Sequence, residues 1–302
     1  MKNYFFTPSQ VMENTIVASV LKTKMPFVKV LILGVFAGMF VAFGASASTA
    51  AMYGIEDPGL ARSLAGVIFP VGLMMILFVG GELFTGNCMM ITGVVDRKIS
   101  ISHFIKNLIL VYLSNFIGSL FVAILQFSGG SEGLFRDEIG AYAIKVAYGK
   151  ISLDGWSAFQ SGICCNILVC VAVLMAACAT DIIGKVVALF FPIMAFVIAG
   201  FEHCVANMYY IPAGMIAASN EKYVTKAMEL YGLTYDQLER LNLLAFLTHN
   251  LIPVTIGNLI GGSLVVALPL YVVYKSESKG SIKAVPNMSI TAKENRNYEK
   301  SV

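Results

Sequence analysis

Two short polar stretches interrupt the long apolar segments of this 302-residue chain. They cover residues 80–87 (GGELFTGN) and residues 200–207 (GFEHCVAN), and long apolar runs flank both. Each stretch is therefore expected at membrane depth, where irregular backbone and ionisable side chains are tolerated only if protein or a water-filled path satisfies them. Two such breaks, one in each half of the chain, are typical of a channel or transporter with a site near the middle of the bilayer.

The apolar segments predict an all-α membrane protein. Hydrophobic residues make up 57% of the chain and charged residues 13%, whereas soluble domains carry about 25% charged residues. We place six spans at residues 28–51, 64–95, 104–127, 158–180, 186–217 and 246–274. The second and fifth are longer than the roughly 20 residues that cross a bilayer. They also carry the polar breaks, so each is expected to consist of two half-helices joined by a loop.

Segments outside the spans predict the orientation and the domain limits. With the amino terminus inside, the inner segments hold twice as many lysines and arginines as the outer ones, which favours two cytoplasmic termini. Residues 1–26 lack a signal-peptide core and are expected to form a cytoplasmic amphipathic helix, with Thr7 and Gln10 in a capping box and Pro8 at its start. Residues 27–275 form the predicted transmembrane domain. Residues 276–302 are polar and aperiodic, which favours a disordered cytoplasmic tail.

A short internal repeat indicates how the two halves are related. Residues 115–118 (NFIG) in the third span resemble residues 258–261 (NLIG) in the sixth, and their glycines would allow helices to approach closely. With three spans in each half, the second half enters the membrane from the opposite side. The prediction is therefore an inverted repeat, with the second and fifth helices broken at equivalent places.

Several classes of function have little support in the sequence. The net charge of +3 gives no reason to expect a nucleic-acid partner. Six cysteines without a CxxC pair, and three histidines far apart, indicate packing residues rather than a metal site, so no metal or other cofactor is expected. The chain has no convincing set of catalytic residues, and we predict that it is not an enzyme. A neutral-solute channel of the aquaporin type remains the alternative class, but the asparagines at both breaks lack the proline of that motif.

Four motifs together resemble the formate/nitrite transporter family: residues 82–86 (ELFTG), 166–172 (NILVCVA), 200–208 (GFEHCVANM) and 250–258 (NLIPVTIGN). The resemblance covers about residues 10–275. It implies an aquaporin-like fold of six helices. It also implies a homopentamer in the lipid bilayer, the bacterial inner membrane, in which each protomer has its own pore for small monovalent anions.

The resemblance also implies a central site. His203 and Thr85 would face each other across the pore centre, with Asn166 as a hydrogen-bonding neighbour. Histidine changes charge near physiological pH, so His203 could bind an anion or transfer a proton to it. The second half-helices, expected to begin at Gly86 and Cys204, would add about half a positive charge each at their amino ends.

Apolar constrictions are expected on both sides of this site, at the positions that match the family: Phe69, Leu83, Phe84 and Phe196. A bare anion would lose its hydration there at a cost of several kcal/mol. We therefore predict that the anion is protonated at or near His203 and crosses as the neutral acid, so protons are also partners.

Polar residues around the breaks have further predicted roles. By resemblance, Lys150 in the outer loop would attract the anion, with Lys145 as a rival. Glu82 and Glu202 are expected to bind the N–H groups of their own loops and to face away from the pore, and Asn87 and Asn207 are predicted to help structure those loops.

The substrate remains open among small anions. Formate, nitrite, hydrosulfide and short monocarboxylates all suit a narrow, weakly basic path. Formate is favoured because the segments around His203 and residues 250–258 resemble formate-type relatives. Nitrite or hydrosulfide is the alternative within the family.

Overall fold

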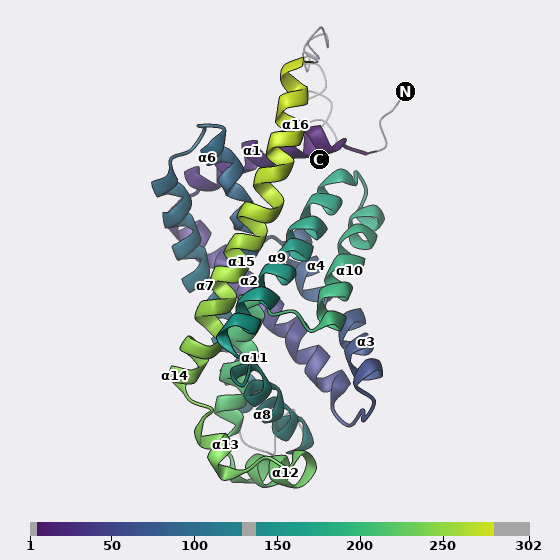
Figure 1. The fold of residues 1–302 in the computed structure, drawn as a ribbon, viewed down its shortest axis with the longest axis vertical. Coiled ribbons are helices and arrows are strands. Elements are labelled where there is room, and N and C mark those ends of the chain that lie inside the picture. Colours follow the sequence, from purple (N-terminus) through teal and green to yellow (C-terminus); the bar gives the residue numbers. More distant parts are fainter. Residues whose placement is uncertain (1–4, 129–136, 281–302) are drawn as a thin grey trace, which may run out of the picture.

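The six predicted spans are present in the computed structural model, which describes residues 5–128 and 137–280, with side chains described to residue 275. Six helical segments in this part of the chain are long and apolar enough to cross a membrane. The first four are α2 (Phe27–Met52), α3 and α4 (Pro58–Ile68 and Val71–Val79), α7 (Ile101–Phe127) and α9 (Gly155–Cys178). The fifth is α10 (Ile182–Ala199), and the sixth runs through α14 (Leu243–Ala245), η2 (Phe246–Leu251), α15 (Ile252–Ile260), η3 (Gly261–Ala267) and α16 (Leu268–Gly280). Figure 1 shows these helices side by side as one bundle.

The second and fifth spans are broken at the two polar stretches. After α4 the chain turns at Gly80, whose φ is 102°, and resumes as α5 (Phe84–Asn87), η1 (Cys88–Met90) and α6 (Ile91–Val95). After α10 it turns at Gly200, whose φ is 73°, and resumes as α11 (Cys204–Ala217). Both glycines have left-handed backbone that other residues adopt at a cost. The start of α11 is as predicted, whereas α5 begins at Phe84 rather than at Gly86.

Close helix contacts relate the two halves. A Cβ atom on Gly118 of α7 would lie 2.0 Å from the carbonyl oxygen of Val35 on α2. A Cβ atom on Gly261, at the matching position in the second half, would lie 2.4 Å from the carbonyl oxygen of Ile163 on α9. The repeat predicted from NFIG and NLIG thus corresponds to two equivalent helix crossings, each of which requires glycine.

The amino-terminal helix α1 (Pro8–Lys24) has the predicted capping box between Thr7 and Gln10. Met12 and Ile16 are buried against the bundle, whereas Val17 and Leu21 on the same helix are exposed. Ser9 Oγ donates to the carbonyl of Tyr274, so α1 and the end of the last span lie at one end of the molecule (Figure 1). Of the predicted tail 276–302, α16 takes in the residues up to Gly280, and the rest lies outside the described residues.

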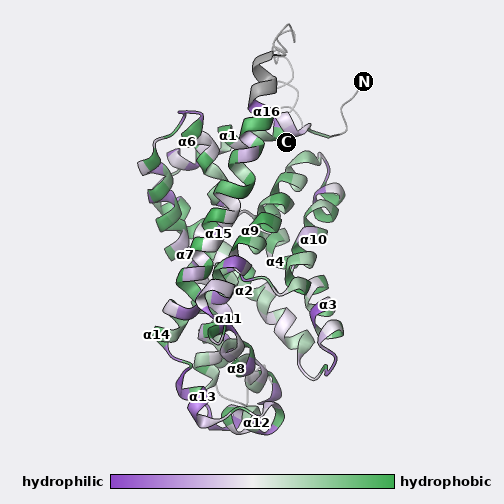
Figure 2. Cartoon of the chain, viewed as in Figure 1, coloured by the Kyte–Doolittle hydropathy of each residue, from purple (hydrophilic) through white to green (hydrophobic). Residues whose placement is uncertain are grey.

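The opposite end carries helices where the sequence led us to expect loops: α8 (Asp137–Ile151), α12 (Glu221–Tyr231) and α13 (Tyr235–Glu239) (Figure 1). Helix α8 buries Ile144, Ala147 and Ile151, whose three- and four-residue spacing forms one face. Figure 2 shows more hydrophilic residues at this end than in the spans between. Lys150 therefore stands in the last turn of a packed helix and not in a loop, which corrects the expectation for this residue.

Candidate functional site

Two asparagines hold the broken backbones in place. Asn115 on α7 donates to the carbonyls of Gly34 and Glu82, and its side-chain oxygen accepts from the Phe84 N–H. Asn258 on α15 donates to the carbonyls of Gly162 and Glu202, and its oxygen accepts from the Cys204 N–H. Both amides are fully buried. Each break thus obtains from a neighbouring helix the hydrogen bonds that an unbroken helix would have made itself.

A partly buried ion pair lies next to the first break. Lys22 Nζ, on α1, lies 2.6 Å from Glu82 Oε1 and 2.8 Å from Asn87 Oδ1. Asn87 in turn donates to Glu82 Oε2 at 2.7 Å and to Asn107 Oδ1 at 2.8 Å. The lysine charge is therefore balanced by a carboxylate that is itself hydrogen-bonded on both oxygens.

The second break carries an equivalent cluster. Lys150 Nζ lies 2.8 Å from Glu202 Oε1, and Glu202 Oε2 accepts from Asn207 at 2.6 Å and from Asn250 at 3.1 Å. Lys150 Nζ also lies over the Tyr210 ring, at 5.1 Å from its centroid. Asn207 Oδ1 is buried without a hydrogen-bond partner among the described residues, unlike Asn87 Oδ1.

The glutamate carboxylates bind these lysine and asparagine side chains and not the N–H groups of their own loops. That part of the sequence prediction is wrong. The Glu82 N–H donates to the Leu33 carbonyl, and the Glu202 N–H donates to Ser161 Oγ. A carboxylate in a region of low dielectric is stabilised more by an ammonium group than by a neutral N–H, which explains the preference.

Thr85 and His203 face each other between the two breaks, as the family resemblance implied. Thr85 Oγ1 and His203 Nε2 are 3.0 Å apart, and both side chains are buried. Asn166 on α9 donates to the Thr85 carbonyl at 3.3 Å and to the Asn258 carbonyl at 2.6 Å. Asn166 thus fixes the backbone of Thr85 and does not contact the imidazole in this conformation.

The hydrogen bonds determine the state of the imidazole. His203 is the N-cap of α11, because its Nδ1 accepts from the Ala206 N–H at 3.1 Å. A ring nitrogen that accepts a hydrogen bond carries no proton, so the neutral ring has its proton on Nε2. Nε2–H then donates to Thr85 Oγ1, which leaves the threonine hydroxyl free to donate to a further group.

A vestibule of about 330 Å³ leads from the α8 side of the molecule to His203. Phe69 and Phe196 line it, with ring centroids 5.5 Å apart, and Phe196 stacks on His203 at 6.1 Å. Lys150 and the more exposed Lys145 both line this vestibule, and Lys145 Nζ lies 4.5 Å from the Tyr231 ring centroid. Two of the predicted constriction residues therefore line this vestibule together with His203.

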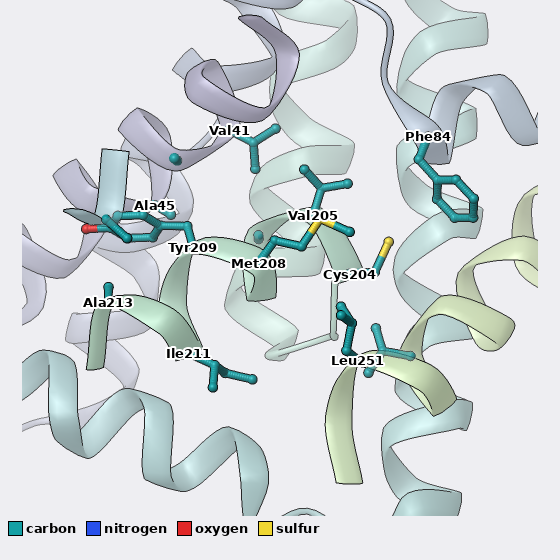
Figure 3. Packing of buried hydrophobic residues seen from close by; sticks show 14 of the residues in the cluster. Val41, Ala45, Phe84, Cys204, Val205, Met208, Tyr209, Ile211, Ala213 and Leu251 are labelled. Atoms are coloured by element: carbon teal, nitrogen blue, oxygen red, sulfur yellow. The ribbon is translucent and has the colours of Figure 1, made fainter. Parts of the chain in front are cut away.

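A second vestibule, of about 580 Å³, opens on the α1 side. Leu83 lines it together with Lys22 and Glu82, and the other walls are mostly apolar. Phe84, also predicted as a constriction, lines neither vestibule and packs edge-to-face on Tyr112 with ring centroids 5.0 Å apart. Figure 3 shows Phe84 with Cys204, Val205 and Met208 of α11 among the buried apolar residues.

Sequence reasoning missed Lys22, Asn107 and Asn250 as members of these clusters. A signal was present, because Asn107 precedes Asn115 by the same interval that separates Asn250 from Asn258. Extending the repeat towards the amino terminus would have paired them. Lys22 had no such signal, since it lies on a helix outside the repeated spans.

Comparisons with known proteins agree with this geometry. The family model described as "Formate/nitrite transporter" matches residues 9–272. A "Probable formate transporter" of Methanothermobacter thermautotrophicus is 36% identical over 92% of this chain and 100% of its own length. The "Formate channel FocA" of Escherichia coli K12 is 32% identical over 85% of this chain and 90% of its own.

Solved structures give the same result. One described as "Pentameric formate channel with formate bound" superposes with a TM-score of 0.72 at 30% identity, covering 82% of this chain and 98% of that one. Another, described as "FNT family ion channel", has a TM-score of 0.74 at 26% identity, covering 87% and 98%. These proteins are channels and transporters rather than enzymes. The chain is a multi-pass membrane protein that belongs to the formate/nitrite transporter family.

Proposed function

We propose that this protein conducts small monovalent anions across the membrane and that formate is its substrate. Relatives named as formate channels or transporters support this choice, as does the similar pentameric channel with formate bound. The family model also covers nitrite, which stays the first alternative, followed by hydrosulfide. By the same likeness we propose a homopentamer in the bacterial inner membrane, with the α1 end in the cytoplasm. Residues 1–26, 27–275 and 276–302 would serve as an inner-surface helix, the channel and a tail.

The contact between Thr85 and His203 carries the proposal. It lies between the two vestibules, where Phe196 covers the imidazole on one side and Leu83 borders the other vestibule. An anion that enters between them would accept hydrogen bonds from the Thr85 hydroxyl and from His203 Nε2–H. Lys150 and Lys22, one in each vestibule, would attract the anion from either side.

Proton transfer at His203 would require a movement. A neutral imidazole that caps α11 through Nδ1 can donate a hydrogen bond, but it has no acidic proton to release. To become a proton donor the ring must gain a proton on Nδ1, which breaks its bond to the Ala206 N–H. We therefore propose that protonation of the anion is coupled to release of this cap, and that the neutral acid then passes the apolar residues at lower cost than the anion.

Two substitutions of His203 distinguish its role as the N-cap of α11 from its role as a proton carrier. An asparagine side chain can cap a helix but cannot carry a proton, whereas phenylalanine can do neither. Purified His203→Asn and His203→Phe, with Thr85→Val and the matched control Thr85→Ser, would be reconstituted in liposomes. Fluxes of formate, nitrite, hydrosulfide and glycerol would be measured at two external pH values.

We expect formate flux to rise as the external pH falls in the parent, and that dependence to vanish in His203→Asn although the protein stays folded. Thr85→Val should lose about tenfold in flux, because one buried hydrogen-bond donor is worth roughly 1.4 kcal/mol, and Thr85→Ser should not. Undiminished, pH-dependent flux through His203→Asn would refute the proton role. Glycerol flux without anion flux would refute the proposed function.

A further inference from the structure

A groove of about 590 Å³ at the α1 end is lined by four basic side chains and lies away from both vestibules. The basic residues are Lys24 at the end of α1, Arg97 and Lys98 in the turn after α6, and His103 in the first turn of α7. The hydroxyls of Thr23 and Ser100 also line it. The transport pathway described above uses none of these residues.

Among the residues that the structure describes, no carboxylate lines this groove. The nearest in sequence, Asp96, accepts a hydrogen bond from Tyr271 OH at 3.0 Å and lies 3.9 Å from Lys275 Nζ on α16. None of Lys24, Arg97 and Lys98 forms an ion pair with another described residue. A concave surface with several cations and no internal counter-charge is suited to an anionic ligand.

The backbone at Arg97 is a separate observation. Its φ is 60°, and Arg97 is the only residue other than glycine with a positive φ among those described. Its N–H bonds the Val94 carbonyl, and the N–H of Lys98 bonds the Gly93 carbonyl, which closes the end of α6. Glycine is the usual residue at this place, since a side chain in left-handed backbone costs about 1 kcal/mol. The fold itself gives no reason for arginine at this position. Backbone strain of this kind is concentrated at functional sites, which indicates that the Arg97 side chain binds something.

The surroundings of the groove identify the kind of anion. Helices α2 and α7 begin beside it, so it stands where two spans leave the membrane. Phe27, Ile101 and Ile105 at these helix starts are 64%, 54% and 48% exposed. Figure 2 shows the hydrophilic turn after α6 next to the largely hydrophobic α7. A basic groove beside exposed apolar side chains fits a phospholipid. Its phosphate would occupy the groove, and its acyl chain would contact the apolar side chains.

We propose that this basic groove binds the headgroup phosphate of an anionic phospholipid of the adjacent leaflet. Lys24, Arg97 and Lys98 contact the phosphate, whereas the hydroxyl of Thr23 stays bonded to the Val20 carbonyl and that of Ser100 to His103 Nδ1. Free phosphate offers the same phosphate oxygens and at least as much negative charge, but no acyl chain for the exposed apolar residues. The lipid ties the end of α1 to the start of α7.

Native mass spectrometry of the full-length protein in a neutral detergent tests the proposal. The probes are phosphatidylglycerol and phosphatidylcholine of equal chain length, with inorganic phosphate as competitor. The variants are Arg97→Gly and Lys98→Gln. Lys185→Gln removes one charge at the same end but outside the groove, and is the matched control.

We expect phosphatidylglycerol to bind more tightly than phosphatidylcholine. Each groove substitution should lower the affinity for phosphatidylglycerol about fivefold, which corresponds to the loss of one cation at a membrane surface. Lys185→Gln should leave this affinity unchanged. Arg97→Gly should be at least as heat-stable as the parent because it relieves the left-handed backbone, which excludes misfolding as the cause of weaker binding. Equal binding of the two lipids, an equal effect of Lys185→Gln, or displacement of the lipid by inorganic phosphate at the same concentration would overturn the proposal.

Discussion

Replacing Lys150 by methionine would show whether this lysine serves the fold, the anion or both. Lys150 Nζ lies 2.8 Å from Glu202 Oε1, and the two side chains are only 17% and 6% exposed. Without the ammonium group, the carboxylate would keep only Asn207 and Asn250 as donors. Breaking a buried pair from one side costs about 3–5 kcal/mol, and the residual exposure of Lys150 places our expectation near about 3 kcal/mol. At 2–4 °C per kcal/mol the apparent Tm should fall by about 6–12 °C.

The double variant Lys150→Met/Glu202→Gln removes both charges and keeps an amide oxygen for the two asparagines. Removing both members of a buried pair is far less costly than removing one, so most of the lost stability should return. Formate flux should stay low, because the attracting charge is still absent. Lys22→Met and Lys22→Met/Glu82→Gln are the equivalent pair of variants at the first break, where the two charged atoms lie 2.6 Å apart.

Unfolding can be followed with a thiol-reactive fluorophore, because Cys88, Cys165, Cys170 and Cys204 are free and buried in the folded protein. Flux would be measured in liposomes on the same preparations. A Lys150→Met protein as stable as the parent would refute the reasoning about the buried pair. If the double variant regained flux together with stability, the charge of Lys150 would not be what attracts the anion.

Two further substitutions test the framework. Gly118→Val should prevent folding, since even a Cβ atom would lie 2.0 Å from the Val35 carbonyl oxygen. Gly149→Ala, with open space around its Cβ, should not, and size-exclusion chromatography of the two purified proteins would distinguish them. Asn258→Leu leaves the Cys204 N–H and the Gly162 and Glu202 carbonyls without this hydrogen-bond partner. Each unpaired group costs about 1–3 kcal/mol, so the apparent Tm should fall by more than in Lys150→Met. An Asn258→Leu protein of parental Tm would show that the breaks hold without their asparagine.

Membrane spans and breaks were predictable because the bilayer imposes a strict rule on sequence. About twenty apolar residues are needed to cross it. A longer apolar segment that contains a glycine, a carboxylate and an asparagine is therefore recognised from sequence as a broken span. The contact between Thr85 and His203 was also predicted, although from family resemblance and not from the spacing of residues. Helix α8 was not predicted, since its apolar face is short and no membrane constrains its length.

The partners of the glutamates could not be deduced for another reason. Lys22 and Glu82 are far apart in the chain, and only the packing of α1 against the bundle brings them to 2.6 Å. The capping box of α1 predicts that the helix forms, but its docking depends on buried residues such as Met12 and Ile16, whose spacing also fits a helix lying in the membrane surface. Local sequence determines the helix, and tertiary contacts determine its place.

The two halves agree where the fold needs them to and differ where the anion would pass. Glu82 and Asn87 correspond to Glu202 and Asn207, and in each set the glutamate pairs with a lysine and accepts a hydrogen bond from its asparagine. Lys22 also donates to Asn87 Oδ1, whereas Asn207 Oδ1 has no partner among the described residues. At the intervening positions Leu83 corresponds to His203 and Thr85 to Val205, and only His203 caps its helix with a side chain. Symmetric hydrogen bonds can hold two irregular loops at membrane depth, but a hydrogen-bonding pair at the centre needs an imidazole from one loop and a hydroxyl from the other. Exchanging the two pairs of residues should therefore preserve the fold while reversing the side on which the imidazole stands.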